Sequence, residues 1–268
     1  MILVSAATGE FGRLVVDRLL EGVAAAELAV AVRNPGKAAD ISARGVDVRQ
    51  ADYDDLPSLR TAFSGVDALL FVSAPVIDSG RLEQHQNVVT AAKDAGVGLL
   101  AYTSGLGADF VEEGVLGEHH QTEQWIIDSG LPYVLLRHPI YTEMYINAGL
   151  QAAIEAGELT SSTRGRGLNT ATRADLAHAA AAVLTAPNSS PNAYNFTGPL
   201  WTYPMLAEVL GEVSGRPVVY REEDDEPGFL GMLAEVVRYG GFEVQTDDLQ
   251  RVLGRPAMSL RESVVAAL

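Results

Sequence analysis

Short apolar runs alternate with amphipathic segments along the first half of the chain. The runs are rich in valine, leucine, isoleucine and alanine, and we predict strands at residues 2–5, 28–32, 46–49, 68–72, 99–103 and 133–136. Two intervening segments carry apolar residues at helical spacing, namely Phe11, Leu14, Val15 and Leu19 in one and Leu82, Val88, Val89 and Ala92 in the other. Strands that alternate with helices form a parallel sheet through right-handed crossovers. The pattern therefore predicts an α/β fold with a doubly wound, Rossmann-type parallel sheet.

Glycines mark the return of the chain toward four of these strands. Gly45, Gly65, Gly96 and Gly130 each come just before a predicted strand. Helices commonly end on a glycine with left-handed backbone. We therefore expect a positive φ at all four positions.

The alternation fades after Pro139. We predict helices at residues 142–156, 173–184, 203–214 and 228–239, joined by longer polar loops and short strands. This change predicts a main domain over residues 1–140 and a smaller C-terminal α/β lobe over residues 141–268. The alanine-rich segment 171–186 is expected to pack back on the main domain.

Charge excludes several classes of partner. The chain has 268 residues, with 19 Lys and Arg against 35 Asp and Glu, and its net charge is −16. Such a surface repels nucleic acids and anionic membranes, so we expect no nucleic-acid partner and no membrane association. The chain begins in a predicted strand without a secretory signal, which favours a cytoplasmic protein. We expect a monomer or a homodimer.

Metal and thiol chemistry are also disfavoured. The chain has no cysteine, which excludes disulfides, thiolate catalysis and cysteine-ligated metals. His119, His120 and Glu123 do not have the spacing of a zinc motif. We expect no metal site.

The segment "ILVSAATGEFG", residues 2–12, predicts a strand that runs into a phosphate-binding turn. Gly9 leaves room for backbone N–H groups to approach a pyrophosphate, and Gly12 lets the following helix lie close to the strand. Ala6 stands where the pattern has its first glycine. We expect the backbone of Ala6 to keep a negative φ, because a Cβ disfavours the left-handed region.

The residues after the second predicted strand select the cofactor. NAD enzymes carry an acidic residue about 20 positions after the glycine turn, whereas an arginine there accommodates the 2′-phosphate of NADP. Here the segment is "VRNPGK", with Arg33 in that position and Lys37 nearby. The sequence therefore predicts NADP(H), with the guanidinium of Arg33 on the phosphate.

With these motifs the chain resembles the NmrA-like group of atypical short-chain dehydrogenases/reductases. The resemblance lies in "AATGEFG", "VRNPGK", "VRQADYDD", "AAKDAGV", "YTS", "SGLPYVLLR" and "ATRADLAHAAAAVL" and covers nearly the whole chain. Within the group the chain looks most similar to type 2 NAD(P)H:quinone oxidoreductases and triphenylmethane dye reductases. The resemblance implies an NADP-binding Rossmann domain and a smaller substrate-side lobe.

The resemblance also implies a set of cofactor-binding residues. They are Thr8, Gly9, Glu10, Phe11 and Gly12 at the pyrophosphate, Arg33 at the 2′-phosphate, Asp52 near adenine, Ser73, Ala74 and Pro75 along the far ribose, and Tyr102, Thr103, Ser104, His138 and Pro139 near the nicotinamide. Lys37 is added to this set from its position near Arg33, as a further positive charge for the 2′-phosphate.

One departure from the family pattern bears on the chemistry. Ordinary short-chain dehydrogenases use Tyr-x-x-x-Lys, and counting back from Gly130 puts Val115 and His119 at these positions. Valine cannot donate a proton, which disfavours simple ketones as substrates. A quinone needs less help, because its reduced anion is a weak base. We therefore expect a small-molecule acceptor such as a quinone, reduced by NADPH without the Tyr–Lys pair.

Three residues are candidates for contact with the acceptor. His119 could hydrogen-bond the nicotinamide ribose or the acceptor, or it could be an ordinary helix histidine. Tyr141 and Tyr145 are four residues apart, so one helical face could present both rings to the acceptor, or both could pack inside the lobe. We take His119 and Tyr141 as candidate catalytic residues and the two tyrosines as candidate substrate-binding residues.

Two alternative functions remain open. Some NmrA-like proteins bind NADP as regulators and catalyse nothing, and the missing Tyr–Lys pair fits that hypothesis. The other alternative is a reductase of triphenylmethane dyes or of another small molecule.

Overall fold

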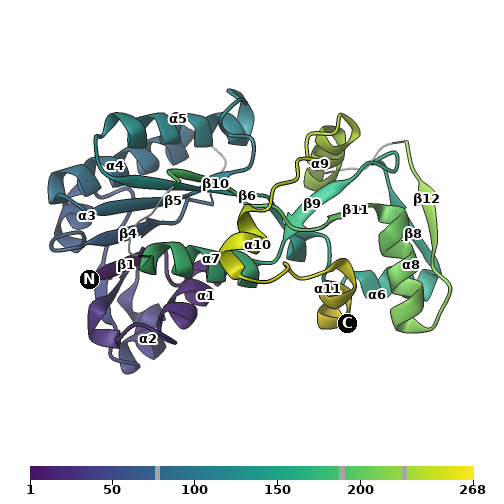
Figure 1. Ribbon diagram of the computed structural model, residues 1–268, viewed down its shortest axis with the longest axis horizontal. Helices are drawn as coiled ribbons and strands as arrows, with labels where there is room; N and C mark the ends of the chain where they lie inside the picture. The colour runs from purple at the N-terminus through teal and green to yellow at the C-terminus, as the bar shows by residue number, and fades with distance from the viewer. Residues whose placement is uncertain (76–78, 187–190, 225–227) are drawn as a thin grey trace. The chain divides into compact units, whose positions relative to one another are not determined.

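Seven strands, six from residues 1–138 and one from residues 193–195, form one parallel sheet (Figure 1). The structure is a computed structural model, which describes residues 1–75, 79–186, 191–224 and 228–268 without the side chains of residues 79, 229, 230 and 232. The strands are β1 (Ile2–Ser5), β2 (Leu28–Val32), β3 (Asp47–Gln50), β4 (Ala68–Phe71), β5 (Leu99–Gly105), β6 (Tyr133–His138) and β10 (Ala193–Asn195). Their order is β10-β6-β5-β4-β1-β2-β3, and every neighbouring pair is parallel. The predicted doubly wound sheet is confirmed.

Some strands have the bounds that the apolar pattern predicts, and others extend beyond them. β1 and β2 have the predicted bounds, whereas β5 and β6 continue past them, to Gly105 and His138. The added residues keep the register, with Ser104 opposite Arg137. Both side chains are buried. Because both residues are polar, an apolar pattern could not identify them as part of a strand. The short strand β10 was not predicted for a different reason, because its three residues are only half-buried and form no apolar run.

Helices cover both faces of the sheet (Figure 1). One face carries α3 (Leu56–Ala62), α4 (Ser79–Ala95) and α5 (Gly114–Asp128), and the other carries α1 (Glu10–Leu19), α2 (Ala39–Ala43) and α7 (Arg173–Thr185). Short 3-10 turns, η1 (Ala25–Glu27) and η2 (Pro35–Ala38), flank β2. The core under α3, α4 and α5 includes the fully buried side chains of Leu69, Phe71 and Leu100. None of the helices in the described ranges has the length and apolar character needed to cross a bilayer.

The helix faces differ from the predicted ones in a few residues. On α1, Phe11, Val15 and Leu19 are buried as predicted, but Leu14 is half-buried. On α4, Leu82 is also half-buried, and the buried face instead begins with Arg81 and His85 before Val88 and Ala92. Polar residues therefore occupy the start of the inner face of α4.

The turn between β1 and α1 contradicts the expected backbone of Ala6. Its φ is +50°, in the left-handed region, whereas a negative value was expected. The N–H of Gly9 donates to the carbonyl of Ala6 at 3.0 Å, and this bond closes the turn. A left-handed conformation at alanine costs about 1–2 kcal/mol, which the turn and the packing of α1 offset. The four glycines before strands all have the expected positive φ.

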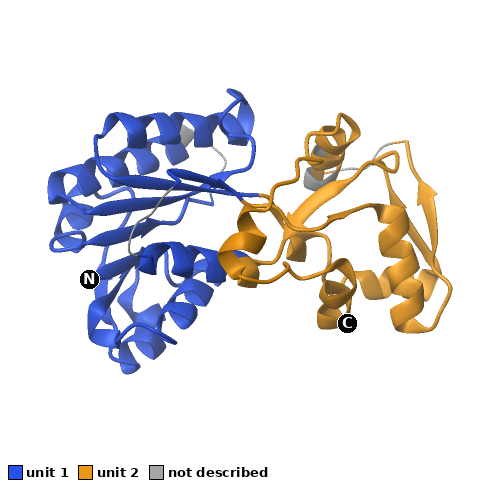
Figure 2. Ribbon diagram, viewed as in Figure 1, with its two compact units in different colours: residues 1–138, 176–195 blue, residues 139–175, 196–268 orange. Residues whose placement is uncertain are grey.

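The chain divides into two compact units (Figure 2). Unit 1 comprises residues 1–138 and 176–195, and unit 2 comprises residues 139–175 and 196–268. The strands of unit 2 are β7 (Ile140–Tyr141), β9 (Leu168–Ala171) and β11 (Leu200–Trp201) in one sheet, and β8 (Glu158–Ser161) and β12 (Val219–Glu222) in another. Its helices and turns are η3 (Thr142–Met144), α6 (Leu150–Ala156), α8 (Tyr203–Ser214), α9 (Gly228–Arg238), α10 (Asp248–Leu253) and α11 (Leu260–Ala267).

The helix predicted at residues 142–156 is wrong in its first half. Residues 142–144 form the 3-10 turn η3, and the α-helix starts only at Leu150. The side-chain carbonyl of Asn147 accepts a hydrogen bond from the N–H of Gly149 at 2.9 Å. This local bond competes with helical backbone pairing, so the helix begins anew after it.

Gly12 permits the close approach of α1 to the end of β1. A Cβ on Gly12 would lie 2.7 Å from the Ala6 carbonyl oxygen and 2.9 Å from the Ala7 Cα. Both neighbours are backbone atoms, which cannot turn away. We predict that Gly12→Ala lowers the free energy of unfolding by about 2 kcal/mol, measured by urea denaturation.

Gly22→Ala is the matched control for this substitution. A Cβ on Gly22 meets no atom within 4 Å, so its effect should stay within about 0.5 kcal/mol. Similar losses in the two variants would contradict the role of Gly12 in helix packing.

Candidate functional site

The strand order reverses between β1 and β4, and the expected cofactor residues of unit 1 gather at this edge of the sheet. In open α/β sheets ligands bind outside the carboxyl ends of the strands at such a reversal. The residues are Thr8, Gly9, Glu10, Phe11 and Gly12 after β1, Arg33 and Lys37 after β2, Asp52 after β3, Ser73, Ala74 and Pro75 after β4, Tyr102, Thr103 and Ser104 within β5, and His138 at the end of β6. The parallel topology therefore brings residues from six strands to one edge.

The glycine loop ends at the start of α1 without a side-chain cap. Gly9 is the N-cap residue and is exposed, with extended backbone at φ −77° and ψ 161°. The N-terminus of a helix favours an anion, because its N–H groups and its dipole point toward the ligand. Phe11 lies behind this point, with its ring 5.2 Å from that of His138 in an edge-to-face arrangement. Burial lowers the pKa of His138 to about 3, so its imidazole is neutral.

The guanidinium of Arg33 has no hydrogen bond or ion pair with any residue in the described part of the chain, and the side chain is exposed. The guanidinium of Arg13, on α1, has partners, because it pairs with Asp40 and also donates to the carbonyl of Lys37. The turn that follows Arg33 is ordered by Asn34, whose side chain accepts from the N–H of Gly36 at 3.0 Å. Arg33 thus offers an uncommitted cation beside a structured turn.

A closed ring of hydrogen bonds joins the ends of β1 and β4 to the loop after β3. The N–H of Val72 donates to the Ser5 hydroxyl at 3.0 Å, and the Tyr53 hydroxyl donates to the carbonyl of Val72 at 2.8 Å. The Ser5 and Tyr53 hydroxyl oxygens are 2.5 Å apart, so Ser5 donates to Tyr53 and completes the ring. Burial raises the pKa of Tyr53, which keeps its proton in place.

Three further expected residues have hydrogen bonds to nearby residues of unit 1. The carboxylate of Asp52 accepts from the N–H of Asp54 at 3.2 Å. After β4, the N–H of Ser73 donates to the hydroxyl of Thr103 at 2.9 Å, and that hydroxyl donates to the Ser73 hydroxyl at 3.3 Å. Ser73 and Thr103 therefore form one unit across adjacent strands.

His119 lies in a buried polar cluster below these loops. Its Nε2 is 2.9 Å from a nitrogen of the Arg81 guanidinium, which can only donate, so Nε2 is the acceptor. The proton of the neutral ring is then on Nδ1, which lies 2.7 Å from the Tyr102 hydroxyl. Burial, then the charge of Arg81, holds the pKa of His119 well below its usual range. Both ring nitrogens thus have partners within unit 1, and the Tyr102 side chain is fully enclosed.

A second buried cluster holds Ser104. Its hydroxyl donates to the Glu123 carboxylate at 2.6 Å, and Arg137 binds the same carboxylate through two nitrogens at 2.9 and 2.7 Å. Burial alone would lower the pKa of Arg137, but its hydrogen bonds to Glu123 raise it above the usual value. Arg137 also contacts Asp109 at 2.8 Å. The cluster fixes the ends of β5 and β6 to α5.

Tyr141 lies in unit 2, shortly after the buried Pro139. The guanidinium carbon of Arg173 lies 4.6 Å from the centre of the Tyr141 ring, and Arg173 also pairs with Glu143 at 3.5 Å. Burial raises the pKa of Tyr141 to about 12, so the phenol keeps its proton. Tyr141 is therefore a potential hydrogen-bond donor held by a cation on its ring face.

The tyrosine pair does not share a helical face as proposed. Tyr141 belongs to the strand β7, and Tyr145 follows a 3-10 turn. The Tyr145 ring packs edge-to-face against Trp201 at 5.8 Å and against Tyr203 at 6.4 Å, inside the core of unit 2. The packing alternative therefore describes the surroundings of Tyr145 in this structure.

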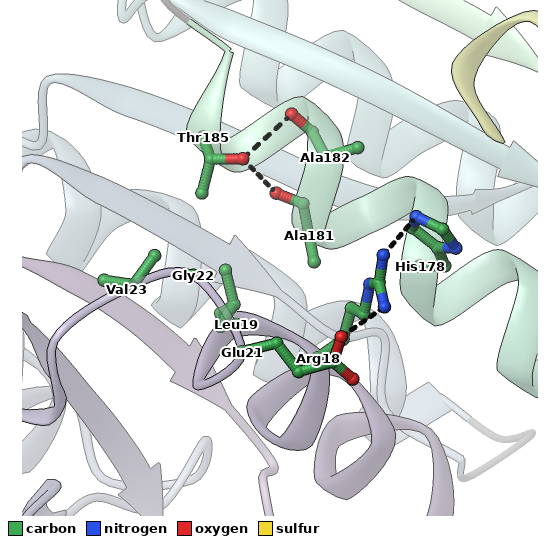
Figure 3. A pocket seen from close by; sticks show the side chains of 9 residues that line it. All are labelled: Arg18, Leu19, Glu21, Gly22, Val23, His178, Ala181, Ala182 and Thr185. Atoms are coloured by element: carbon green, nitrogen blue, oxygen red, sulfur yellow. Dashed lines mark hydrogen bonds and ion pairs between the residues drawn. The ribbon is translucent and has the colours of Figure 1, made fainter. Parts of the chain in front are cut away.

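A separate pocket of about 430 Å³ lies between the C-terminal end of α1 and helix α7 (Figure 3). Arg18 crosses it and contacts His178 at 2.8 Å. None of the expected cofactor residues lines this pocket. Within the residues that the structure describes, no cluster of three or more histidine, aspartate or glutamate side chains is arranged to hold a metal ion.

The sequence analysis missed the buried polar residues that bind the expected cofactor loops. Arg81, His85 and Glu123 are buried and touch the expected cofactor loops, yet none was singled out for a role of its own in the site. A usable signal exists for two of them. Arg81 and His85 are four residues apart and continue the apolar face of α4, where an unpaired polar residue would be costly.

Comparisons with known proteins agree with this geometry. The 268-residue chain is 37% identical to quinone oxidoreductase 2 of Escherichia coli, over 98% of this chain and 97% of that protein. A crystal structure of the Escherichia coli NADPH-dependent quinone oxidoreductase with NADPH matches with a TM-score of 0.92 at 37% identity over 99% of each chain. The Citrobacter sp. triphenylmethane reductase with NADP(H) matches with a TM-score of 0.95 at 36% identity over 100% of each chain.

The family comparison covers the part of the chain that carries the glycine loop, Arg33 and the strand ends. A family model described as NAD(P)H-binding matches residues 6–187, which is more than half of the chain. The chain therefore belongs to the NAD(P)H-binding family.

Proposed function

We propose that the protein is an NADPH-dependent oxidoreductase that transfers hydride to a quinone or a similar conjugated acceptor. The observation that carries the proposal is the guanidinium of Arg33, which is exposed, has no partner among the described residues and follows the strand next to the glycine loop, in a chain of the NAD(P)H-binding family. A charged pair of hydrogen bonds from arginine matches the geometry of a phosphate. The relatives named for quinone and dye reduction support the choice of acceptor.

The residues present fit the cofactor. The N-cap of α1 carries no side chain, and Arg33 lies at the end of the neighbouring strand β2. The net charge of −16 works against an anionic ligand, so recognition depends on these local groups. When bound, NADPH supplies the hydride, and the protein supplies binding and orientation.

The acceptor must need no proton from the protein in the hydride step. Val115 stands at the position of the missing tyrosine, and His119 is neutral with both ring nitrogens engaged. A quinone that gains a hydride becomes a hydroquinone anion, a weak base that takes its proton from water. A simple ketone would become an alkoxide, which needs a nearby acid.

We assign the remaining roles on the same basis. Tyr141 keeps its proton and is proposed to donate a hydrogen bond to the acceptor. His119 is proposed to act through Arg81 rather than as an acid. We also propose that the protein works in the cytoplasm. We propose that it is a monomer or homodimer, and light scattering after gel filtration tests this oligomeric state.

The direct test is oxidation of NADPH by purified protein. Benzoquinone, a naphthoquinone and a cationic triphenylmethane dye are supplied in turn, and absorbance of the reduced nicotinamide is followed. We expect turnover with at least one of the quinones and much slower oxidation without acceptor. NADPH binding with no turnover on any acceptor would instead favour the sensor, and turnover confined to the dye would favour the dye reductase.

Arg33→Asp tests the choice of cofactor. Loss of the cation and gain of a negative charge should raise the Kd for NADPH at least about tenfold, while the Kd for NADH changes by less than about threefold. Titration of each cofactor by fluorescence gives both constants.

Arg44→Asp is the control, because it makes the same change in charge on unit 1. Arg44 is exposed, but it pairs with Asp17 on α1 and stands outside the expected cofactor site. If Arg33→Asp weakened both cofactors equally, or no more than Arg44→Asp does, the guanidinium of Arg33 would not bind the 2′-phosphate.

A further inference from the structure

Ala74, in the loop after β4, has both of its backbone polar groups bound by side chains of α4. Its N–H donates to Nε2 of His85 at 3.0 Å, and its carbonyl accepts from Nε of Arg81 at 2.9 Å. All three residues are buried. Loop backbone usually relies on water or on neighbouring backbone, so two charged or titratable partners at one residue are unusual.

The same arginine extends the contact to α5. Its two terminal nitrogens lie 2.7 Å from the Glu118 carboxylate and 2.9 Å from Nε2 of His119. The Arg81 residue is only 2% exposed. One guanidinium therefore joins the loop after β4 to two residues of the neighbouring helix, and each of its three nitrogens has a partner.

The direction of each bond fixes the protons of the cluster. His85 accepts at Nε2, so its proton is on Nδ1, which lies 2.9 Å from the Thr122 hydroxyl. That hydroxyl donates to the carbonyl of Glu118 at 2.8 Å and is thus free to accept from His85. Burial, then the charge of Arg81, lowers the pKa of His85 to about 3, so the ring keeps this pattern near neutral pH.

We propose that Arg81 and His85 are positioning residues that hold the loop of Ser73, Ala74 and Pro75 in the conformation that receives the nicotinamide half of the cofactor. The inference rests on the proposed function, which gives this loop its cofactor. Neither side chain needs to touch the cofactor, because both act through the backbone of Ala74. Arg33, on the far side of β1, holds the other half of the same molecule.

The positioning role of Arg81 depends on the planar shape of its guanidinium. Its planar fork reaches a carbonyl, a carboxylate and an imidazole at fixed angles, whereas a lysine ammonium is a single point charge. Arg81→Lys keeps the charge beside Glu118 but cannot serve all three partners. We expect the carbonyl of Ala74 to lose its partner and the loop to lose its fixed conformation.

The test compares two ligands that share one end. NADPH reaches both halves of the site, whereas adenosine 2′,5′-bisphosphate has the adenosine and its phosphates without nicotinamide. We expect Arg81→Lys to raise the Kd for NADPH at least about tenfold and to leave the Kd for the bisphosphate within about twofold. A general loss of structure would weaken both ligands together.

Arg60→Lys is the matched control. Arg60 of α3 pairs at 2.7 Å with Asp94, near the C-terminal end of α4, whereas Arg81 and His85 are near its start. This variant also replaces an arginine that anchors α4, and we expect both constants to stay within about twofold of the original protein.

Two substitutions of His85 keep the test decisive if Arg81→Lys does not fold. His85→Leu removes the acceptor for the N–H of Ala74, whereas the amide oxygen of His85→Gln can take the place of Nε2. We expect the leucine variant to bind NADPH at least about tenfold more weakly and the glutamine variant to recover to within about threefold.

The outcomes separate the inference from the proposed function. Equal losses for both ligands, no loss in Arg81→Lys, or no recovery by His85→Gln would overturn the positioning role. If the unsubstituted protein bound neither NADPH nor the bisphosphate, the proposed function itself would fail.

Discussion

The hydrogen-bonded ring of Ser5, Tyr53 and Val72 holds together the edge of the sheet on which the site depends. At this edge β1 and β4 are neighbours, yet their chains leave toward helices on opposite faces, so no further backbone ladder joins them. Side-chain hydroxyls take over where the ladder stops. Because the ring is closed, each of its two hydroxyls has both a donor and an acceptor, although the ring is only partly buried. The loops after β1, β3 and β4 therefore keep a common geometry.

The negative net charge of the protein opposes the binding of an anionic cofactor. A net charge of −16 favours solubility and repels polyanions, but a phosphorylated cofactor is itself an anion. Short-range groups resolve the conflict, since screening in salt confines the general field to about 10 Å. Most arginines of unit 1 described above are paired with carboxylates, as Arg13 is with Asp40. Arg33, whose guanidinium has no ion pair with any residue in the described part of the chain, stands out against this background and is the group that we propose for the cofactor phosphate.

Prediction from the sequence succeeded where the signal is local and failed where partners are distant in the chain. β1 and β2 and the helix α8 follow from apolar pattern and turn chemistry within a few residues. The role of Arg81 depends on Ala74, Glu118 and His119, which the fold brings together and no local spacing reveals. The positive φ of Ala6 likewise follows from the packing of α1, which overrides the residue's own preference.

The buried clusters also explain why this site tolerates the loss of a proton donor. An acid that works in catalysis must exchange its proton with the substrate, so it needs a pKa near the working pH and a path to the reacting atom. His85 and His119 have neither, because burial lowers their pKa values and every ring nitrogen has a partner. His85 instead holds the backbone of Ala74, and His119 holds the side chains of Arg81 and Tyr102. A protein built in this way is suited to acceptors for which orientation beside the cofactor is sufficient, because their reduced anions leave as weak bases.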